Sequence, residues 1–425
     1  MKEEKTVVSI FQSVARAVDG ARLVRESLGA HIDSSWHPTA VLALGKVAFP
    51  MFDGVRPFLR EQGGVSRALL IAPASRFPAN PDLPPGAQAL VADHPTPSER
   101  SLAAGTAAQA FVEALQPNDR LLVLISGGGS ALVAGPAEGL SFKDKRDTVT
   151  AVARAGATIA ELNAVRKHLS SIKGGRLALA TRAQTRVLSL SDVVGNDPGT
   201  IASGPFSPDT STFSDALAIV KRLAPNGPKA AIDHLQRGVD GAMDDTPKPG
   251  DPRLAHVDYR ILASPERVLA LGEAEGLARG LTIRTLARNT EEDVGVLAER
   301  YGTIAKTGAA AGTLFVGNGE PSIRVSGSGR GGRATHLALL MAQQLAGLSG
   351  VSFLSAGTDD RDGASEASGA AVDGDTWSRA LSAGLDPVGA LANCNSDPVL
   401  AELGCLVRGP GTSNLLDLHL LHFAG

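Results

Sequence analysis

The sequence predicts an α/β protein of two domains, the larger with a mostly parallel sheet and helices on both faces, the smaller with a mixed sheet. Three observations support this prediction. The 425 residues are too many for one hydrophobic core, short apolar runs alternate with helical patterns, and a polar, proline-rich stretch interrupts that alternation. Ligands of open α/β sheets bind outside the carboxyl ends of the strands, so we expect the active site there.

The first thirty residues predict one or two helices laid against the core, because Val7, Phe11, Val14 and Val18 recur at helical spacing. Helical patterns such as 99–115 then alternate with apolar runs, which favours a parallel sheet. The runs that predict the strands of the larger domain are residues 40–44, 68–72, 89–92, 121–125 and 186–190.

A polar, proline-rich stretch at residues 225–253 predicts the linker between the domains. The predicted domains therefore cover residues 1–240 and 253–425. The smaller domain is expected to contain strands at residues 259–263, 281–285, 313–316, 322–326, 351–355 and 415–420.

The charge balance favours a small-molecule ligand. The chain has 41 basic and 44 acidic side chains, a net charge of −3 and no long run of like charge, which argues against a nucleic-acid or membrane partner. No apolar run is long enough to cross a bilayer, no signal-peptide pattern is visible, and Cys394 and Cys405 lack the spacing of metal ligands. We therefore expect a cytoplasmic protein, and the sequence leaves a homodimer open.

A glycine triplet follows the strand predicted at residues 121–125. Glycines at a strand end let backbone N–H groups approach a ligand closely, and anions favour such places. A phosphate cradle and an ordinary tight turn are both compatible with the triplet. The candidate cofactor-binding residues here are Ser126, Gly127, Gly128, Gly129 and Ser130.

Two more candidates lie at the ends of other strands. Lys46 ends the strand at residues 40–44 without a P-loop around it, and a lysine at a strand tip can act as a point charge on a phosphate or carboxylate. His94 follows another strand and could serve as a base, although a turn histidine between prolines fits it better.

Residues 161–176 predict a helix that ends near Gly174, with apolar residues toward the core and a polar stripe on the opposite side. The stripe either points into a cleft and binds an anion or forms a solvated face, and cations near a helix carboxyl end are favoured in any case. Its members are Asn163, Arg166, Lys167 and Ser170, and Lys173 follows them. We take Asn163, Arg166 and Lys173 as candidate cofactor-binding residues.

Two acidic loops also follow predicted strands. The loop after residues 186–190 contains Asp192, Gly195 and Asp197, and the loop after residues 351–355 contains Asp359. Such loops suit either a metal and phosphate site or a turn, and an Asx turn alone is sufficient to explain Asp197. We favour Asp192 as a functional carboxylate and regard Asp359 as a catalytic or magnesium-binding candidate.

A glycine-rich turn at residues 327–333 opens a helix predicted at 334–345. It matches G-x-G-x-x-G formally, yet no acidic residue about twenty positions further on closes a following strand, so a dinucleotide site is disfavoured. Arg330 and Arg333 within the turn suggest bidentate clamps on phosphate or carboxylate oxygens, with solvent-facing arginines as the alternative.

Taken in order, these motifs resemble the bacterial glycerate 2-kinase family over nearly the whole chain. The matching segments are residues 45–46, 94–97, 126–132, 162–170, 173–176, 191–197, 203–205, 329–333 and 357–359. The resemblance departs from the family pattern in the second domain, where Ala334, Thr335 and His336 replace asparagine, glutamine and glutamate.

The resemblance implies a Rossmann-like amino-terminal domain, a carboxy-terminal MOFRL domain and an active site in the cleft between them. It also implies ATP- and Mg²⁺-dependent phosphorylation of D-glycerate at its 2-hydroxyl to give 2-phosphoglycerate. Lys46 matches the active-site lysine of the family, and Arg330 or Arg333 matches its second important cation. In this hypothesis the glycine triplet and the loop from Asp192 bind the ATP phosphates and magnesium. Lys46 and either Arg330 or Arg333 bind the substrate carboxylate and the transferring phosphoryl group. Asp192 or Asp359 accepts the proton of the attacking hydroxyl.

Three other functions stay open on the sequence alone. An NAD(P)H-dependent hydroxypyruvate reductase is an older label for such chains, although no nicotinamide site is visible. A non-catalytic protein that binds small acids would need the cations but not the acidic loops. A kinase for a related four-carbon sugar acid is the nearest competitor.

Overall fold

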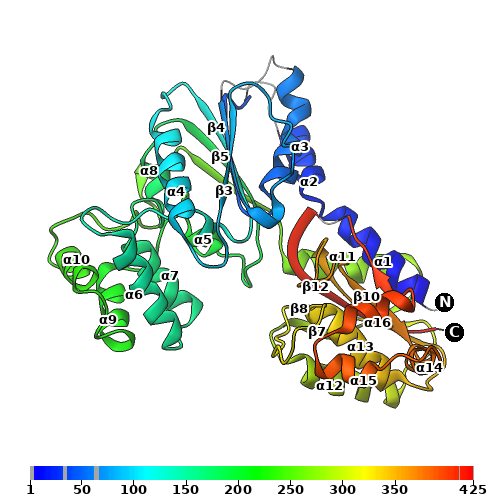
Figure 1. The fold of residues 1–425 in the computed structure, drawn as a ribbon. Helices are drawn as coiled ribbons and strands as arrows, with labels where there is room; N and C mark the ends of the chain where they lie inside the picture. The colour runs from blue at the N-terminus through cyan, green and yellow to red at the C-terminus, as the bar shows by residue number, and fades with distance from the viewer. Residues whose placement is uncertain (1–3, 32–35, 62–66, 411, 425) are drawn as a thin grey trace. The chain divides into compact units, whose positions relative to one another are not determined.

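The computed structural model describes residues 4–31, 36–61, 67–410 and 412–424. The chain forms two compact units, each of which we describe by itself (Figure 1). The amino-terminal unit is Val24–Leu262. The carboxy-terminal unit combines Ala263–Gly425 with Met1–Leu23.

A six-stranded sheet in the order β3-β2-β1-β4-β5-β6 is the centre of the amino-terminal unit. Its strands from β3 to β5 all pair in parallel, and β6 forms the edge beside β5. The central strands β1 and β4 are apolar and buried almost throughout, as expected for strands covered on both faces. The bounds are β1 Ala40–Leu44, β2 Arg67–Pro73, β3 Ala87–Ala92, β4 Arg120–Ile125, β5 Gln184–Leu190 and β6 Val257–Ala263.

Helices cover both faces of this sheet, as the sequence predicts. Helix α3 (Ala48–Glu61) packs on β1, β2 and β4, and α4 (Glu99–Glu113) packs on β2 and β3 from the other side (Figure 1). Most of α2 (Gly20–His31) and the short helices α5 (Gly129–Leu132) and α8 (Arg176–Leu179) also belong to this unit, and α5 packs on α4 and β2. The crossover helices are amphipathic or small-residue helices whose apolar sides meet the sheet core.

Four more helices of the same unit pack around a separate apolar core. They are α6 (Phe142–Arg154), α7 (Ile159–His168), α9 (Phe213–Leu223) and α10 (Lys229–Val239) (Figure 1). Helix α10 lies within residues 225–253, the stretch predicted as a linker. That prediction is wrong: α10 contributes Ala231 and Leu235 to the helical core, so the stretch belongs to the amino-terminal unit.

The carboxy-terminal unit contains a six-stranded mixed sheet in the order β11-β10-β9-β12-β8-β7, which confirms the predicted sheet type. Every neighbouring pair is antiparallel except β7 and β8. The bounds are β7 Thr282–Thr290, β8 Thr313–Gly319, β9 Val351–Asp359, β10 Gly369–Asp373, β11 Leu406–Val407 and β12 Thr412–Phe423.

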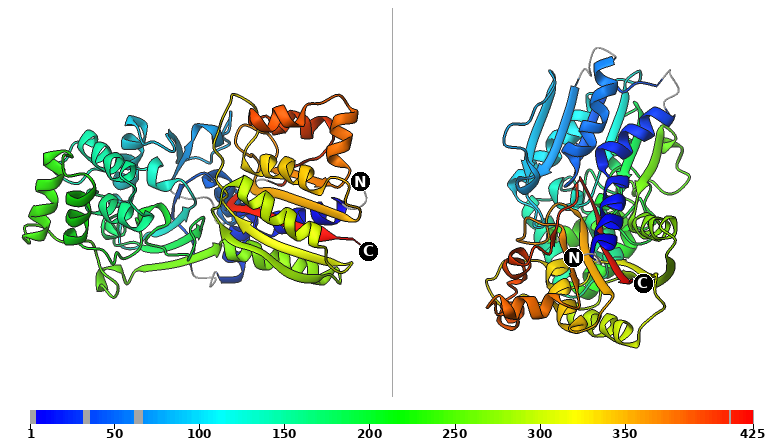
Figure 2. Two further views of the ribbon diagram at one scale, coloured as in Figure 1. Left: turned by 90° about the horizontal axis from the view of Figure 1, so that it is seen from below. Right: turned by 90° about the vertical axis from the view of Figure 1, so that its right-hand side faces the viewer.

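Helices α1 (Glu4–Ala17) and α11 (Pro265–Ala278) pack on one face of this sheet, and α12 (Val294–Thr307) and α13 (Arg333–Leu345) lie on the other (Figures 1 and 2). Three short helices follow β10: α14 (Thr376–Ser382), α15 (Pro387–Ala392) and α16 (Ser396–Glu402). Among the described residues, no helix combines the length and the apolarity needed to cross a membrane.

Three features differ from the sequence-based expectations. Helix α1 was expected within residues 1–240, yet it packs on β9, β10 and β12, because its stripe of Val7, Ile10, Phe11 and Val14 is covered there. The strand expected at 259–263 in the smaller domain is part of β6 in the parallel sheet. Residues 322–326 alternate like a strand but form only an isolated parallel bridge, between Ser322 and Asp293.

Candidate active site

The sheet order places Lys46 and the glycine triplet side by side. In the order β3-β2-β1-β4, the connections from β1 and β4 leave to opposite faces, and the crevice at such a switch point is where ligands of these sheets bind. The backbone N–H of Lys46 donates to Gly127 O at 2.9 Å, and that of Ser126 donates to Leu44 O at 3.1 Å. The buried Ser126 hydroxyl accepts from the N–H of Val47 at 3.0 Å. The sequence-predicted cation and triplet therefore form one structure.

Gly128 is required at its position both by conformation and by space. Its φ is 86°, in the left-handed region that favours glycine. A Cβ there would lie 3.1 Å from His94 Cδ2 and 3.3 Å from Lys46 Cγ, so His94 also joins this group. The N–H groups of Gly127 and Gly128 donate to no backbone oxygen in the part of the chain that the structure describes. The turn thus presents amide donors beside the Lys46 side chain.

The His94 residue is exposed, yet its pKa is lowered. Loss of solvent around the ring lowers it first, and the positive charge of Lys46 adds to the effect. His94 is therefore neutral at pH 7. Neither Lys46 nor His94 forms a salt bridge with a described acidic side chain.

A strained segment supports the other side of the triplet. Ala202 and Ser203 have φ values of 54° and 59°, a left-handed conformation that costs non-glycine residues about 1–2 kcal/mol each. A Cβ on Gly129 would lie 2.6 Å from that of Ala202. The Ser130 and Ser203 hydroxyls are 2.8 Å apart, and Ser203 donates to Asn163 Oδ1 at 2.9 Å. These contacts connect the triplet to α7.

The polar stripe of α7 is buried, which excludes a solvated face. Asn163 is 3% exposed, Lys173 only 2%, and Arg166 is partly buried. The helix ends at His168, earlier than the end near Gly174 that the sequence predicts, and Lys173 Nζ lies 3.5 Å from Ala202 O. Burial and then the charge of Arg166 lower the pKa of Lys173 to about 7. Arg166 and Lys173 form no salt bridge among the described residues.

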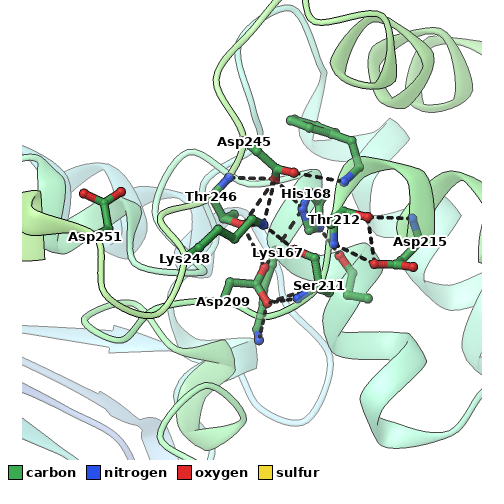
Figure 3. Close-up of polar contacts among 12 residues, drawn as sticks. Lys167, His168, Asp209, Ser211, Thr212, Asp215, Asp245, Thr246, Lys248 and Asp251 are labelled. Atoms are coloured by element: carbon green, nitrogen blue, oxygen red, sulfur yellow. Dashed lines mark hydrogen bonds and ion pairs between the residues drawn. The ribbon is translucent and has the colours of Figure 1, made fainter.

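Lys167, on the same stripe, is already neutralised. It pairs with the buried Asp209 at 3.0 Å, and Thr246 donates to the other Asp209 oxygen at 3.0 Å (Figure 3). His168 has Ala164 O and Asp245 Oδ1 at 2.8 Å from its two ring nitrogens. Burial opposes ionisation of Asp245, yet His168, the N–H of Thr246 and the charge of Lys248 together outweigh it and lower the pKa of this carboxyl. This network has the geometry of a structural support for α7.

The loop after β5 contains three of the predicted site residues, and the structure gives one of them a purely local role. Asp192 is partly buried directly beyond the strand, and Gly195 is exposed. Asp197 accepts from the N–H of Gly199 at 3.1 Å and from the Thr200 hydroxyl at 2.7 Å, which is the Asx turn considered above. Ligand contacts of Asp192, Gly195 and Asp197 therefore stay predictions.

In the carboxy-terminal unit, both arginines of the glycine turn are paired. Arg330 Nη2 lies 2.6 Å from Asp397 Oδ1. Arg333 donates two hydrogen bonds to Asp417, from Nε at 2.7 Å and from Nη2 at 3.2 Å. Glu320 is a second partner of Arg333. Burial opposes the charge of Arg333, but Asp417 and Glu320 together outweigh it and raise the arginine's pKa. Neither arginine is simply a solvent-facing turn residue.

Asp359 is the last residue of β9 and lies close to Asp417, the partner of Arg333. A Cβ on Gly357 would lie 2.8 Å from Asp359 Oδ1 and 3.2 Å from Asp417 Oδ1, so the two carboxylates flank that glycine. Asp362 accepts from the N–H groups of Ala334 and Thr335 at 3.1 and 2.7 Å and so holds the start of α13. Burial and then the charge of Asp417 raise the pKa of Asp362 to about 6.

The carboxylates do not gather into a metal centre. Among the described residues, no group of three or more His, Cys, Asp and Glu side chains is placed to hold an ion. Asp192 belongs to the amino-terminal unit and Asp359 to the carboxy-terminal unit. Magnesium binding by Asp192 and Asp359 stays a prediction.

Several charged residues of these sites were missed from the sequence. Asp417 and Asp397 are acids within apolar patterns, and Lys145 replaces an apolar residue in the stripe of α6. A charged residue at a position where the pattern predicts an apolar one would have indicated a buried ion pair or a ligand site, since charged residues are almost never buried without a partner. Ser203 lies in the matching segment 203–205 but is not among the predicted site residues, and no local signal points to Asp209.

Together these features define a two-domain α/β protein with a Rossmann-like parallel sheet and a cationic, glycine-lined site at its switch point. Residues 6–236 match the model of a domain of unknown function, DUF4147, and residues 313–417 match the MOFRL family. The chain therefore belongs to the family of proteins that combine these two domains.

Relatives with assigned names fall into the same family. The D-glycerate 2-kinase of Thermotoga maritima is 34% identical, with 77% of this chain and 78% of that protein aligned. A protein of Agrobacterium vitis that carries a provisional hydroxypyruvate reductase label is 36% identical over 78% of this chain and 76% of its own length. The crystal structure of glycerate kinase from Thermotoga maritima superposes with a TM-score of 0.85 at 29% identity, covering 99% of both chains.

Proposed function

We propose that this chain is an ATP-dependent glycerate 2-kinase that transfers a phosphoryl group to the 2-hydroxyl of D-glycerate, giving 2-phosphoglycerate. The observation that carries the proposal is the contact of Lys46 with the glycine turn at the switch point of the parallel sheet. An ammonium group beside open amide donors suits a phosphate, and the relatives named glycerate kinase give the reaction.

ATP fits the donor set of the amino-terminal unit. The cradle at Gly128 would be filled by any side chain, which leaves room for a ligand's oxygens only while glycine is present. We propose that Gly127 to Ser130, Asn163, Arg166 and Lys173 bind the phosphates, while Lys46 neutralises charge on the transferring group. Phosphoryl transfer depends on such positioning and charge stabilisation more than on covalent chemistry by the protein.

The proton of the attacking hydroxyl needs an acceptor, and Asp192 or Asp359 is our candidate. For the substrate carboxylate we favour Arg330 over Arg333, because 59% of the Arg330 side chain is exposed, whereas Arg333 is held by two acids. Magnesium would be bound mainly through the nucleotide's phosphates, which is how this ion is commonly held in kinases.

A nicotinamide-dependent hydroxypyruvate reductase fits the observed site less well. The turn after β1 is Gly45-Lys46-Val47-Ala48, without the three glycines that approach a dinucleotide's pyrophosphate. The glycine-rich turn at 327–333 precedes α13 but follows no strand of its own. We retain the reductase as an outcome of the test.

One set of assays tests the proposal. ADP release is measured with D-glycerate, L-glycerate and four-carbon hydroxy acids, and enolase then reports 2-phosphoglycerate, which it dehydrates, unlike the 3-phosphate isomer. We expect ADP release with D-glycerate and a positive enolase response. Turnover of NADH with hydroxypyruvate and no ADP release would overturn the proposal, and a preference for a four-carbon acid would correct its substrate.

A further inference from the structure

We propose that Lys145 of α6 completes, with Arg166 and Lys173, a buried anion site that binds the polyphosphate of the nucleotide. This inference rests on the proposed function for the identity of the anion, because the geometry itself defines only a group with two or more negative charges. Neither the sequence motifs nor the family resemblance singles out Lys145.

Lys145 stands where an apolar side chain is expected. The buried side of α6 consists of Phe142, Lys145, Thr148 and Val152, spaced by one helical turn. Lys145 is 6% exposed, and its Nζ donates to Gly135 O at 2.9 Å. A buried ammonium group is costly unless it is paired with an acid or bound to a ligand. Its position therefore requires a reason.

Holding Gly135 O is not a sufficient reason. This carbonyl oxygen already accepts from the Ser170 hydroxyl at 2.8 Å and from the N–H of Ser171 at 3.1 Å. Two donors satisfy the two lone pairs of a carbonyl oxygen. Removing the lysine would leave no unpaired acceptor at Gly135, so the loop does not depend on the ammonium group.

The charges around Lys145 are of its own sign. Lys173, Arg166 and Arg176 are the charged groups that act on it. Burial, followed by repulsion from these three, holds the pKa of Lys145 well below its ordinary value. None of Lys145, Arg166 and Lys173 has a salt bridge to an acid in the described ranges, whereas the nearby Lys167 is paired with Asp209.

The comparison with Lys167 shows that Lys145, Arg166 and Lys173 lack an acidic partner within the described chain. A buried cation that serves the fold has its acid within the protein, as Lys167 does. Arg176 is partly compensated, since Asp245, Asp209 and Asp244 act against the loss of its charge. Three cations without an acid form a site whose negative charge must come from a ligand. A phosphate chain supplies that charge and accepts hydrogen bonds from all three.

The test compares Lys145→Met with Lys143→Met in the full-length protein. Lys143 lies on the same helix, but its side chain is 77% exposed and pairs with Asp147. Binding of inorganic pyrophosphate and of ATP is measured by titration calorimetry, with melting temperatures before and after ligand. We expect Lys145→Met to weaken both ligands at least tenfold and to remove the ligand-induced rise in melting temperature, while Lys143→Met changes binding less than twofold.

A structural role predicts different results. If Lys145 only supports the helix, Lys145→Met lowers the melting temperature of the free protein and leaves the dissociation constants within twofold, which would overturn the proposal. We expect the free variant to melt no lower than wild type, because a repelled charge is removed. Lys145→Arg should restore binding, and Lys145→Gln gives the same comparison if the methionine variant does not fold.

The outcome separates this inference from the proposed kinase activity. If wild type binds pyrophosphate through Lys145 but does not phosphorylate glycerate, the anion site stands and the proposed function fails. If glycerate is phosphorylated and the nucleotide KM of Lys145→Met equals that of wild type, the function stands and the anion site fails.

Discussion

Both units have basic residues beside glycine-rich turns, but only those of the carboxy-terminal unit are paired with acidic side chains that the structure describes. In the amino-terminal unit, Lys46, Arg166 and Lys173 have no salt bridge to a described acid. In the carboxy-terminal unit, Arg330 and Arg333 are each paired with a buried aspartate. Uncompensated cations are available to an anionic ligand, whereas compensated ones stabilise the fold. We therefore expect anion recognition in the amino-terminal unit, and five experiments test this expectation.

The largest effect is expected from Lys46→Ala. Loss of a positioned charge at the transferring group should reduce kcat about 10²- to 10³-fold. The melting temperature should stay near that of wild type, since Lys46 has no salt bridge to lose among the described residues. Steady-state kinetics and thermal melting check both points, with Lys46→Arg as the variant that keeps the charge. Unchanged kinetics would remove Lys46 from the site.

In the carboxy-terminal unit, Asp417→Asn should act on stability instead of ligand binding. The side chain of Asp417 is 4% exposed and that of Arg333 28%, so the arginine would lose a largely buried partner. We expect a loss of about 2–3 kcal/mol in the free energy of unfolding, measured by urea denaturation.

The control for this variant is Glu292→Gln in the exposed Arg300–Glu292 pair of the same unit, where we expect a loss below about 1 kcal/mol. The nucleotide KM should be unchanged in both variants. A tenfold rise in that KM for Asp417→Asn would show that the Arg333 pair serves the ligand site and would break the comparison.

Lys173→Met should weaken ATP binding by about 10- to 100-fold, the contribution of one or two charge-assisted hydrogen bonds. The KM for glycerate should change less than that for ATP. Lys173→Arg serves as the matched variant that retains a cation. An equal loss of affinity for both substrates would indicate a general distortion of the site.

The smallest effect concerns pH. The pKa of Lys173 is about 7 in the free protein, and an anion stabilises the charged form. Binding therefore takes up a proton above pH 7, and the KM for ATP should rise severalfold between pH 7 and pH 9. In Lys173→Arg the arginine stays charged, so this rise should be reduced. A wild-type KM that falls over this range would contradict the assigned sign.

The same residue also affects the stability of the free protein. Its folded pKa lies below its ordinary value of 10.5, so the unfolded chain binds more protons between pH 7 and 10.5. The contribution of Lys173 to stability therefore increases as pH rises through that window. Ligand affinity and free stability should change in opposite directions with pH, which a thermal melt with and without pyrophosphate can measure.

Much of the fold could be predicted because its signals are local. The unbroken apolar runs at Ala40–Leu44 and 121–125 predict buried strands, which the structure confirms, and the glycines that follow them mark the strand ends. Helix α1 shows the limit of such signals. Its apolar stripe shows that it must be buried, but not which of the two sheets buries it.

Local sequence patterns are sufficient to predict the strand ends, the glycine turn and the set of basic residues from which an anion site could be built. Which of those basic side chains has an acidic partner, and which is left to a ligand, depends on the tertiary structure. The acids that neutralise the others come from far along the chain: Asp209 is 42 residues from Lys167, Asp397 is 67 from Arg330, and Asp417 is 84 from Arg333. Electrostatic compensation depends on distance in space, and no local pattern encodes a partner that folding brings from so far away.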